Sequence, residues 1–446
     1  MSNHNIIEFH ASSTTSMSGL ARVPGDKSIS HRSIMMGSIA DGVTQVKGFL
    51  EGEDALCTMN AFRDMGVKID GPVDGKVTVY GVGLHGLKPS SKPLDCGNSG
   101  TSMRLISGLL AGQDFDSELV GDASLSKRPM KRVMDPLALM GANIHALEGG
   151  RPPLKVRGKR PLKAIHYDLP MASAQVKSCV LLAGLYADGI TSVTEPAITR
   201  DHTERMLNGF GVQVKTENGQ ISIEGGQVLK ATSIDVPSDI SSAAFFMVAA
   251  SICENADITL KHVGMNPTRT GIIDILKLMG ANLELSNHAV VGGEPVADVR
   301  IRSAQLKGIQ IPEHLVPLAI DEFPVLFVAA ANAIGQTVLT GAEELRVKES
   351  DRIAVMAKGL QACGIDATPT VDGMIINGVG GQPGTRYHSA EIESQGDHRI
   401  AMSFTVAAIR ATGTMRIKGA QTVDTSFPGF VQLASSLGLN VQSVKI

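Results

Sequence analysis

The chain is poor in cysteine, aromatic residues and long apolar runs, and each shortage excludes a class of protein. Its 446 residues include five cysteines, no Trp and 4% aromatic residues. The cysteines stand at least 39 positions apart, which leaves no Cys-x-x-Cys motif and favours reduced, buried thiols. The longest apolar runs, such as 243–252, are about half of the roughly 20 residues that a membrane-spanning helix needs. Since residues 1–18 also lack the pattern of a secretory signal, we expect a cytoplasmic protein without membrane contact.

Motifs for metals and nucleic acids are also missing. The twelve histidines show neither His-x-x-x-His nor His-Glu-x-x-His spacing, so we expect no metal. Segment 127–163 holds ten Lys or Arg against two acids, in a chain whose net charge is −3. Proteins that bind nucleic acids usually combine such cations with aromatic side chains for stacking, and aromatic residues are scarce here. The charge pattern therefore favours small anionic ligands over nucleic acid.

A repeat with a period near 70 residues organises the chain. Six stretches each run from a helix-like pattern through a glycine into an alternating, strand-like pattern, and glycine suits the position after a helix because a positive φ costs it little. Each unit also opens with a helix rich in small and apolar residues, which predicts burial. Six such units divide naturally into two groups of three. The six glycines are Gly66, Gly141, Gly211, Gly280, Gly364 and Gly438.

The length of the chain and two segments rich in Pro, Gly and Ser predict two lobes. Pro, Gly and Ser cluster near 19–23 and near 236–240, where the chain would enter and leave the first group of units. We therefore predict one lobe from 20–238 and a second from 1–19 plus 239–446. Two connections make a hinge, and we expect a ligand-binding cleft between the hinged lobes.

Polar residues concentrate at the starts of the predicted buried helices, where unpaired N–H groups attract anions. Ser28 and Arg32 lie four residues apart and so share one helical face. Segment 97–101 consists of small residues that let a ligand approach the backbone closely. Segment 344–352 packs six charges into nine residues. A salt-bridged helix start would explain that segment without a function, while its closeness to Asp321 supports the functional alternative.

Seven motifs, read in order, resemble the 5-enolpyruvylshikimate-3-phosphate synthase family. The resemblance covers essentially residues 18–433 and implies an inside-out α/β barrel of two lobes, each built from three βαβαββ units with buried helices. It implies transfer of the enolpyruvyl group of phosphoenolpyruvate to the 5-hydroxyl of shikimate 3-phosphate, in the shikimate pathway to chorismate and aromatic amino acids. It implies a monomer with no metal or organic cofactor. The motifs are PGDKSISHR, GNSGTSMR, GDASLSKRPM, LPMASAQVKS, DEFPVLFVAAA, ELRVKESDRI and DHRIAMSF.

The resemblance also implies roles for individual residues. Asp321 is the expected proton acceptor for the attacking hydroxyl, while Lys27 and Glu349 are expected to protonate the methylene carbon and manage the later proton loss. The two substrates together carry a charge of roughly −5 to −6, which requires several cations when no metal is present. The implied ligands of shikimate 3-phosphate are Lys27, Ser28, Arg32, Ser173, Ala174, Gln175, Arg200, Asp321 and Lys348. Those of phosphoenolpyruvate are Lys27, Gly100, Arg128, Gln175, Arg352 and Arg399, with Asn98 and Thr101 shaping the same loop.

The sequence departs from the family pattern at a few positions. Thr425 stands two residues before Phe427-Pro428, where some members carry a Lys that faces phosphate. The residues at two further positions, Ala174 and Leu105, resemble those found in the branch of the family often called class II. Members of that branch can resist glyphosate, the herbicide that mimics phosphoenolpyruvate and targets this family, commonly with Ala where this chain has Gly100.

Two other functions fit parts of the pattern. UDP-N-acetylglucosamine enolpyruvyl transferase shares the architecture and the donor, but it typically uses a loop cysteine as general acid, and segment 121–128 contains no cysteine. A phosphate-sugar-binding or RNA-end-processing protein could also be built on such repeats. Asp321 and Glu349, together with Lys27, favour catalysis over binding because carboxylates near an anionic ligand repel it unless the chemistry needs them.

Overall fold

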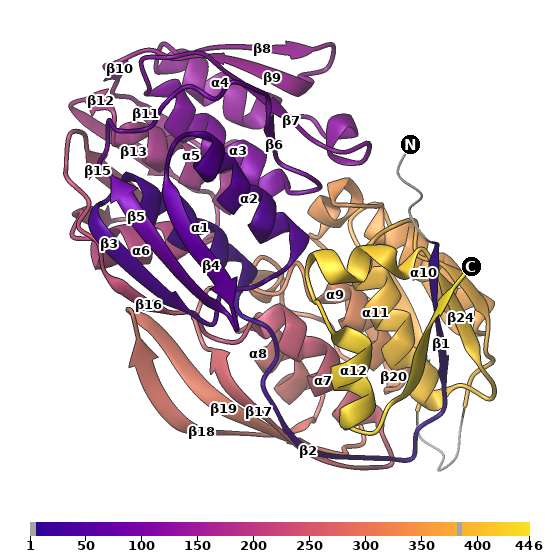
Figure 1. The fold of residues 1–446 in the computed structure, drawn as a ribbon. Helices are drawn as coiled ribbons and strands as arrows, with labels where there is room; N and C mark the ends of the chain where they lie inside the picture. Colours follow the sequence, from indigo (N-terminus) through magenta and orange to yellow (C-terminus); the bar gives the residue numbers. More distant parts are fainter. Residues whose placement is uncertain (1–5, 381–385) are drawn as a thin grey trace. The chain divides into compact units, whose positions relative to one another are not determined.

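The computed structural model describes residues 6–380 and 386–446 and shows an α/β protein (Figure 1). Within these residues the chain forms twelve α-helices and seven β-sheets. It divides into two compact units: unit 1 is Met1–Pro24, Pro237–Ala289 and Pro295–Ile446, and unit 2 is Gly25–Val236 and Val290–Glu294. Residues 1–5 of the predicted 1–19 segment lie outside the described residues. Each unit has its own apolar core.

Unit 2 contains three four-stranded sheets, each accompanied by two helices. The first sheet has the order β16 (Ser233–Asp235), β3 (Asp41–Lys47), β5 (Lys76–Val82), β4 (Lys68–Val73), with helices α1 (Lys27–Ile39) and α2 (Glu53–Asp64). The second is β6 (Leu94–Asp95), β7 (Ser117–Val120), β9 (Arg151–Arg157), β8 (Asn143–Leu147), with α3 (Gly100–Ala111) and α4 (Lys131–Leu139). The third is β11 (His166–Asp168), β13 (Ile190–Thr194), β15 (Gln220–Glu224), β14 (Val214–Glu217), with α5 (Ala174–Gly184) and α6 (His202–Gly209). Strands β10 (Leu162–Lys163) and β12 (Ala187–Asp188) form a small additional pair.

Unit 1 has a similar composition over its described residues. One sheet is β18 (Asn282–Val291), β19 (Glu294–Arg302), β17 (Asn255–Gly264), β2 (Ser16–Ala21), with α7 (Ile240–Ile252) and α8 (Gly271–Leu278). A three-stranded sheet is β20 (Ile334–Leu339), β22 (Met374–Val379), β21 (Asp366–Pro369), with α9 (Phe323–Ala331) and α10 (Arg352–Ala362). The last is β23 (Glu391–Glu393), β24 (Met415–Lys418), β1 (Ile7–Ser12), β25 (Asn440–Lys445), with α11 (His398–Ala407) and α12 (Phe430–Ser436). Short 3-10 turns are η1 (Leu125–Lys127), η2 (Glu313–Leu315), η3 (Glu343–Val347), η4 (Ala408–Arg410) and η5 (Ala420–Thr425).

Four of these sheets share one pairing pattern. In each, a parallel pair at one edge is followed by two antiparallel pairs, as in β16–β3, β3–β5 and β5–β4. The same sequence of pairings recurs in the sheets that begin with β6, β11 and β23. The recurrence shows that segments about 70 residues apart fold in the same local way.

The predicted glycine positions at the helix ends are confirmed. Helices α2, α4, α6, α8, α10 and α12 each end two residues before one of the six glycines, and each glycine has a positive φ, between +81° and +105°. A residue with a Cβ would be strained in that conformation, which is why glycine recurs where the chain turns from helix to strand.

The predicted burial of the opening helices is also confirmed. Every residue of α7 and α9 is buried, and so are eleven of the thirteen residues of α1. In unit 1, helices α7, α9 and α11 pack on one another, and in unit 2 helix α3 packs against both α1 and α5 (Figure 1). Because these buried helices consist mainly of small and apolar residues, their polar groups lie chiefly at the N-terminal ends. Most of the predicted site residues lie at these ends.

The N-terminal segment pairs with the second half of the chain. Strand β1 lies between β24 and β25 and is antiparallel to both, with Phe9 opposite Ile417 on one side and Ser443 on the other. Strand β2 runs parallel to β17. Unit 1 therefore takes two strands from the start of the chain.

The five cysteines are free thiols; four are buried and Cys57 is partly buried. Across the described ranges, none of the helices combines the length and the apolar content that a membrane span requires.

Candidate active site

Unit 1 gathers five predicted site residues into one cluster of charges. They come from the turn before α9, from the segment between η3 and α10, and from the first turns of α10 and α11. Asp351 caps α10 by accepting a hydrogen bond from the N–H of Ala354, and Asp397 caps α11 by accepting one from the N–H of Arg399. These two caps fix where the helices begin. The five residues are Asp321, Lys348, Glu349, Arg352 and Arg399.

Arg352 lies at the centre of this cluster and is 1% exposed. It donates from Nε to Asp397 Oδ2 at 2.9 Å, from Nη2 to Glu349 Oε2 at 2.6 Å and from Nη1 to Asp321 Oδ1 at 3.3 Å. Burial lowers the pKa of Arg352, but Asp397, Glu349 and Asp321 outweigh burial and hold that pKa above its ordinary value. A guanidinium with a planar fork can hold several carboxylates in fixed positions, and Arg352 does so here.

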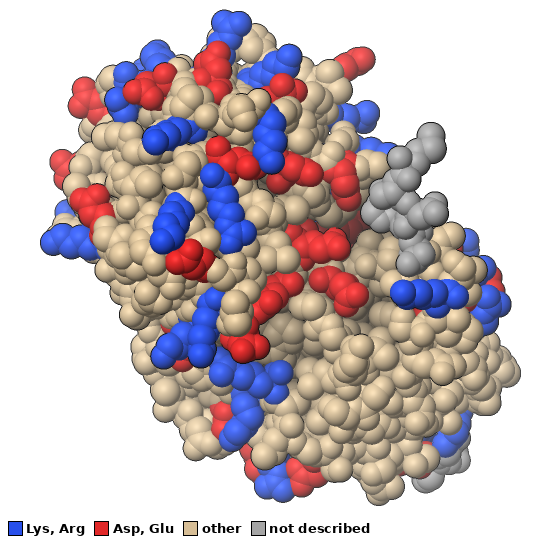
Figure 2. All heavy atoms as spheres, in the orientation of Figure 1, with Lys and Arg blue, Asp and Glu red and all other residues tan. Residues whose placement is uncertain are grey.

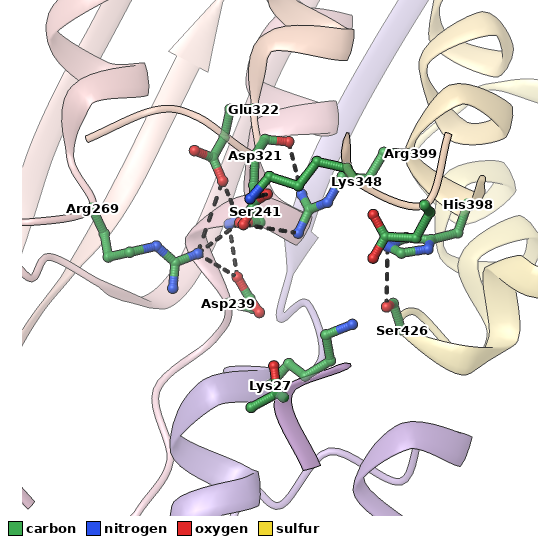
Figure 3. Close-up of polar contacts among 12 residues, drawn as sticks. Lys27, Asp239, Ser241, Arg269, Asp321, Glu322, Lys348, His398, Arg399 and Ser426 are labelled. Atoms are coloured by element: carbon green, nitrogen blue, oxygen red, sulfur yellow. Dashed lines mark hydrogen bonds and ion pairs between the residues drawn. The ribbon is translucent and has the colours of Figure 1, made fainter. Parts of the chain in front are cut away.

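Two further cations contact Asp321. Lys348 Nζ lies 3.7 Å from Asp321 Oδ1 and 2.6 Å from Glu344 Oε1. Arg399 donates from Nη1 to the backbone carbonyl of Asp321 at 3.0 Å, and its Nη2 lies 3.9 Å from Asp321 Oδ2 (Figure 3). Asp321 is thus a partly exposed carboxylate among three cations, a setting in which a carboxylate can accept a proton and adjacent cations can hold an anion.

A buried polar network adjoins Asp321 on the other side and was not predicted. Arg269 Nη2 donates to Ser241 Oγ at 2.6 Å and lies 3.4 Å from Asp239 Oδ1 and 3.8 Å from Glu322 Oε1. Ser241 in turn donates to Glu322, the residue after Asp321 (Figure 3). All four side chains are buried. The network ties the start of α7 to the start of α9 and so holds the turn that carries Asp321.

In unit 2, two basic residues from the first motif have different partners. Asp26 caps α1, and Lys27 follows it with Nζ 3.0 Å from Asp54 Oδ2 on α2. One turn later, Arg32 is buried and donates from Nε to Thr203 Oγ1 at 2.7 Å and from Nη2 to Ser178 Oγ at 2.9 Å. Burial lowers the pKa of Arg32 to about 10, although Glu204 and Asp26 oppose the effect. Arg32 is therefore still a cation near neutral pH.

A second group in unit 2 surrounds the start of α3. Gln175 accepts a hydrogen bond from Arg104 and donates from Nε2 to Thr101 Oγ1 at 2.9 Å. A Cβ added to Gly100 would lie 3.0 Å from Arg104 Nη1 and 3.4 Å from Arg128 Nη1. Two guanidinium groups therefore flank the start of this helix, and glycine leaves the space between them open.

Arg128 is fixed by the loop that precedes α3. It donates from Nη2 to Asn98 Oδ1 at 2.7 Å, and Asn98 donates to Asp122 Oδ2 at 2.7 Å. The remaining predicted residues of unit 2 lie at other helix starts: Ser28 is the second residue of α1, Ser173 caps α5, Ala174 is the first residue of α5, and Arg200 lies two residues before α6. Most predicted residues of unit 2 thus lie at or near the starts of α1, α3, α5 and α6, while Arg128 follows η1 and contacts the loop before α3.

Among the residues that contact predicted site residues, Asp397 and Arg104 had no assigned role in the sequence analysis. Asp397 was noted at a helix start, but its contact with Arg352 spans 45 residues and no local pattern indicates it. Arg104 stands inside a quoted motif, and its position four residues after Gly100 was the signal that could have placed it on the same face of α3. Residues 6–380 and 386–446 contain no group of three or more His, Cys, Asp or Glu that could hold a metal ion.

Helix starts that carry cations and paired carboxylates define an α/β protein suited to acid–base chemistry on anionic ligands. Comparisons with known proteins specify the family within this class. The family model described as EPSP synthase (3-phosphoshikimate 1-carboxyvinyltransferase) matches residues 12–433. The 3-phosphoshikimate 1-carboxyvinyltransferase of Hydrogenovibrio crunogenus is 65% identical over 99% of this chain and 100% of its own length.

Solved structures agree. An EPSP synthase structure from Acinetobacter baumannii is 60% identical, covers 99% of this chain and 100% of that chain, and superposes with a TM-score of 0.89. The enolpyruvyl transferase NikO from Streptomyces tendae shares the fold, with a TM-score of 0.78 at 15% identity over 99% of this chain and 100% of that chain. The chain belongs to the EPSP synthase family.

Proposed function

We propose that this chain transfers the enolpyruvyl group of phosphoenolpyruvate to the 5-hydroxyl of shikimate 3-phosphate and releases inorganic phosphate, as a step of the shikimate pathway to chorismate. Membership of the family supports the reaction. The observation that carries it is the unit 1 cluster, in which Asp321 lies within 4 Å of the cationic groups of Lys348, Arg352 and Arg399. One carboxylate among three cations combines a proton acceptor with an anion site.

Shikimate 3-phosphate is assigned to cationic and small polar residues at helix starts. Arg32 and Ser28 are proposed to hold its carboxylate, and Arg32 is suited to this because Ser178 and Thr203 already fix its guanidinium. Its phosphate is assigned to Arg200, Lys348 and the start of α5, where helix N–H groups favour an anion. The proposed ligands are Lys27, Ser28, Arg32, Ser173, Ala174, Gln175, Arg200, Asp321 and Lys348.

Phosphoenolpyruvate is assigned to arginines of both units. Arg352 and Arg399 are proposed to take its carboxylate, because a guanidinium fork matches a planar anion. Arg128 and Gln175 are proposed to take its phosphate beside the open start of α3, where Arg104 adds a further cation. The proposed ligands are Lys27, Gly100, Arg128, Gln175, Arg352 and Arg399.

The proposed mechanism is addition followed by elimination. Asp321 accepts the proton of the attacking 5-hydroxyl, and the C–O bond forms to the central carbon of phosphoenolpyruvate. Lys27 and Glu349 protonate the methylene carbon and then remove a proton from it as phosphate leaves. Glu349 Oε2 accepts a hydrogen bond from Arg352 Nη2 at 2.6 Å, which holds this carboxyl group in a fixed position within the cluster.

The finer architecture is part of the same proposal. We propose that each lobe is an inside-out α/β barrel of three βαβαββ repeats, with lobe boundaries at 20–238 and at 1–19 plus 239–446. The recurring pairing pattern, the regular helix ends and the buried opening helices support this arrangement.

We further propose that the enzyme works as a cytoplasmic monomer without a nucleic-acid partner. On the face shown in Figure 2, Lys and Arg side chains are scattered among Asp and Glu and form no continuous basic expanse. Such mixing supports small anionic ligands, since nucleic-acid binding usually depends on a continuous basic surface.

A substrate-exchange assay tests the proposed reaction. Purified enzyme is mixed with phosphoenolpyruvate and either shikimate 3-phosphate or UDP-N-acetylglucosamine, and phosphate release is measured. We expect release with shikimate 3-phosphate and none with the nucleotide sugar. Release with the nucleotide sugar instead would favour UDP-N-acetylglucosamine enolpyruvyl transferase, and saturable binding without turnover would favour a binding protein.

A further inference from the structure

Helix α5 carries a buried lysine that the proposed reaction does not use. Lys177 is 1% exposed, and its Nζ lies 2.8 Å from Glu204 Oε1 and 3.1 Å from Glu195 Oε2. Both carboxylate side chains are themselves less than a tenth exposed. A buried ammonium is strongly unfavourable unless it is paired, so these three groups constrain one another. The ion pairs tie α5 to the residue after β13 and to the first turn of α6.

Glu195 extends this constraint to the loop before α6. The backbone N–H of Thr199 donates to Glu195 Oε1 at 3.1 Å, and Thr199 Oγ1 donates to Oε2 at 2.6 Å. Thr199 is buried and is followed directly by Arg200. The main chain at Arg200 is therefore fixed relative to α5, whose first residues are assigned to the same substrate.

A residue adjacent to each charged partner adds a further hydrogen bond between the two helices. Thr203, beside Glu204, donates to Ser178, beside Lys177, at 2.7 Å. Both hydroxyls also accept hydrogen bonds from Arg32. The contacts between α5 and α6 therefore involve both arginines that are assigned to shikimate 3-phosphate. Arg32 donates hydrogen bonds to Ser178 and Thr203, and Arg200 directly follows the anchored Thr199.

We propose that Lys177 is a positioning residue for binding shikimate 3-phosphate: through Glu195 and Thr199 it fixes the segment that presents Arg200 to the substrate phosphate. This inference rests on the proposed function. A guanidinium whose main chain is already ordered loses less conformational freedom when it binds a phosphate, so preorganisation raises affinity for that group.

Lys177→Gln is the direct test, measured as steady-state kinetics with both substrates. We expect KM for shikimate 3-phosphate to rise roughly tenfold, as for loss of a charge-assisted contact, with KM for phosphoenolpyruvate and kcat within about twofold. Lys177→Arg, which keeps the charge, is expected to recover most of the loss. Unchanged KM for shikimate 3-phosphate in folded Lys177→Gln would overturn the proposal.

Thr199→Val supplies a second variant, because Lys177→Gln leaves two buried carboxylates without their cation and can fail to fold. It keeps the shape of the side chain and the ion pairs of Lys177 but removes the hydroxyl donated to Glu195. We expect the ratio of affinities for shikimate 3-phosphate over shikimate to fall roughly tenfold, because the phosphate is the group that Arg200 is proposed to bind. A lower melting temperature with an unchanged ratio would mean that the contact is merely structural.

Thr191→Val is the matched control. Thr191 is a buried residue of β13 whose hydroxyl has no hydrogen-bond partner among the described residues. The substitution has the same chemistry as Thr199→Val, and we expect it to leave both affinities unchanged.

A double-mutant cycle separates this inference from the proposed function. Arg200→Ala alone is expected to weaken shikimate 3-phosphate binding, and Thr199→Val should add little in that background. If Arg200→Ala has no effect, the assignment of Arg200 in the proposed function is wrong. If Arg200→Ala has an effect and Thr199→Val adds its full effect to it, the positioning role is wrong.

Discussion

Arg352 is the residue on which the charge balance of unit 1 depends. It faces Asp321, Glu349 and Asp397, and Lys348 and Arg399 supply two more positive charges around Asp321. Removing a buried cation from such a set leaves carboxylates that repel one another, which typically costs about 3–5 kcal/mol. Substitution of Arg352 therefore tests folding as much as catalysis, and a partly exposed member of the cluster is a better probe of the chemistry.

Asp321→Asn is that probe. The amide keeps the size of the side chain but cannot accept the proton of the substrate hydroxyl, so we expect phosphate release to fall by about 10²–10⁴-fold. Binding of shikimate 3-phosphate, measured by titration calorimetry, should remain detectable. Asp424→Asn, at an exposed position, should match the unaltered enzyme. Near-normal turnover by Asp321→Asn would remove Asp321 from the mechanism.

The sequence could predict those site residues whose role shows in a local motif. Asp321, Lys348, Glu349, Arg352 and Arg399 were predicted from motifs and lie in one cluster, while their roles in the reaction stay predictions.

Other residues could not be predicted because their importance comes from tertiary contacts. Lys177 looks like an ordinary helix lysine, and its partners Glu195 and Glu204 lie 18 and 27 positions further along the chain. Asp397 meets Arg352 across 45 positions. No period or motif in the sequence marks such a pairing.

At the scale of elements, the helix-to-strand turn is the feature most readily predicted. A positive φ is a local demand that glycine meets, and the six glycines recur at the same place relative to the helices. Strand register is different, because it depends on distant partners: the pairing of Phe9 with Ile417 and Ser443 follows from no local signal.

Two glycines at the end of α6 give a matched test of that demand. Gly209 is the last residue of the helix and Gly211 follows with φ of +84°, and an added Cβ would meet nothing within 4 Å at either position. Gly211→Ala should therefore destabilise the protein by about 1–2 kcal/mol through backbone strain alone. Gly209→Ala should stabilise it by up to about 1 kcal/mol through helix propensity. Urea unfolding measures both, and equal shifts would contradict the conformational argument.

At the scale of the whole molecule, the two units differ in how they use the chain. Unit 2 consists of the continuous stretch Gly25–Val236 and the short additional segment Val290–Glu294. Unit 1, in contrast, takes β1 and β2 from the N-terminal segment. Because β1 lies between β24 and β25, its loss would leave two strands with unpaired edges.

Separate fragments test this difference. We expect fragment 25–236 to unfold cooperatively on heating and fragment 237–446 to aggregate, with neither releasing phosphate. The backbone N–H of Ile446 donates to the carbonyl of Ile6 at 2.9 Å, so a short turn can join the two ends. Appending such a turn and residues 6–24 after Ile446 should make the second fragment soluble. Circular dichroism and size exclusion provide the readout, and a well-folded 237–446 would contradict the expectation.

The position of β1 also determines when, during translation, this strand can pair with its neighbours. Ile7–Ser12 is translated before the other described strands, yet the strands on either side of it, Met415–Lys418 and Asn440–Lys445, follow about 400 residues later. At roughly 5–20 residues per second, about 400 intervening residues delay its pairing by roughly 20–80 s. Unit 2 can finish folding during that interval. The nascent β1 must meanwhile keep its amides hydrated or held by a chaperone, so this strand waits longer for its native partners than the strands whose partners are close in sequence.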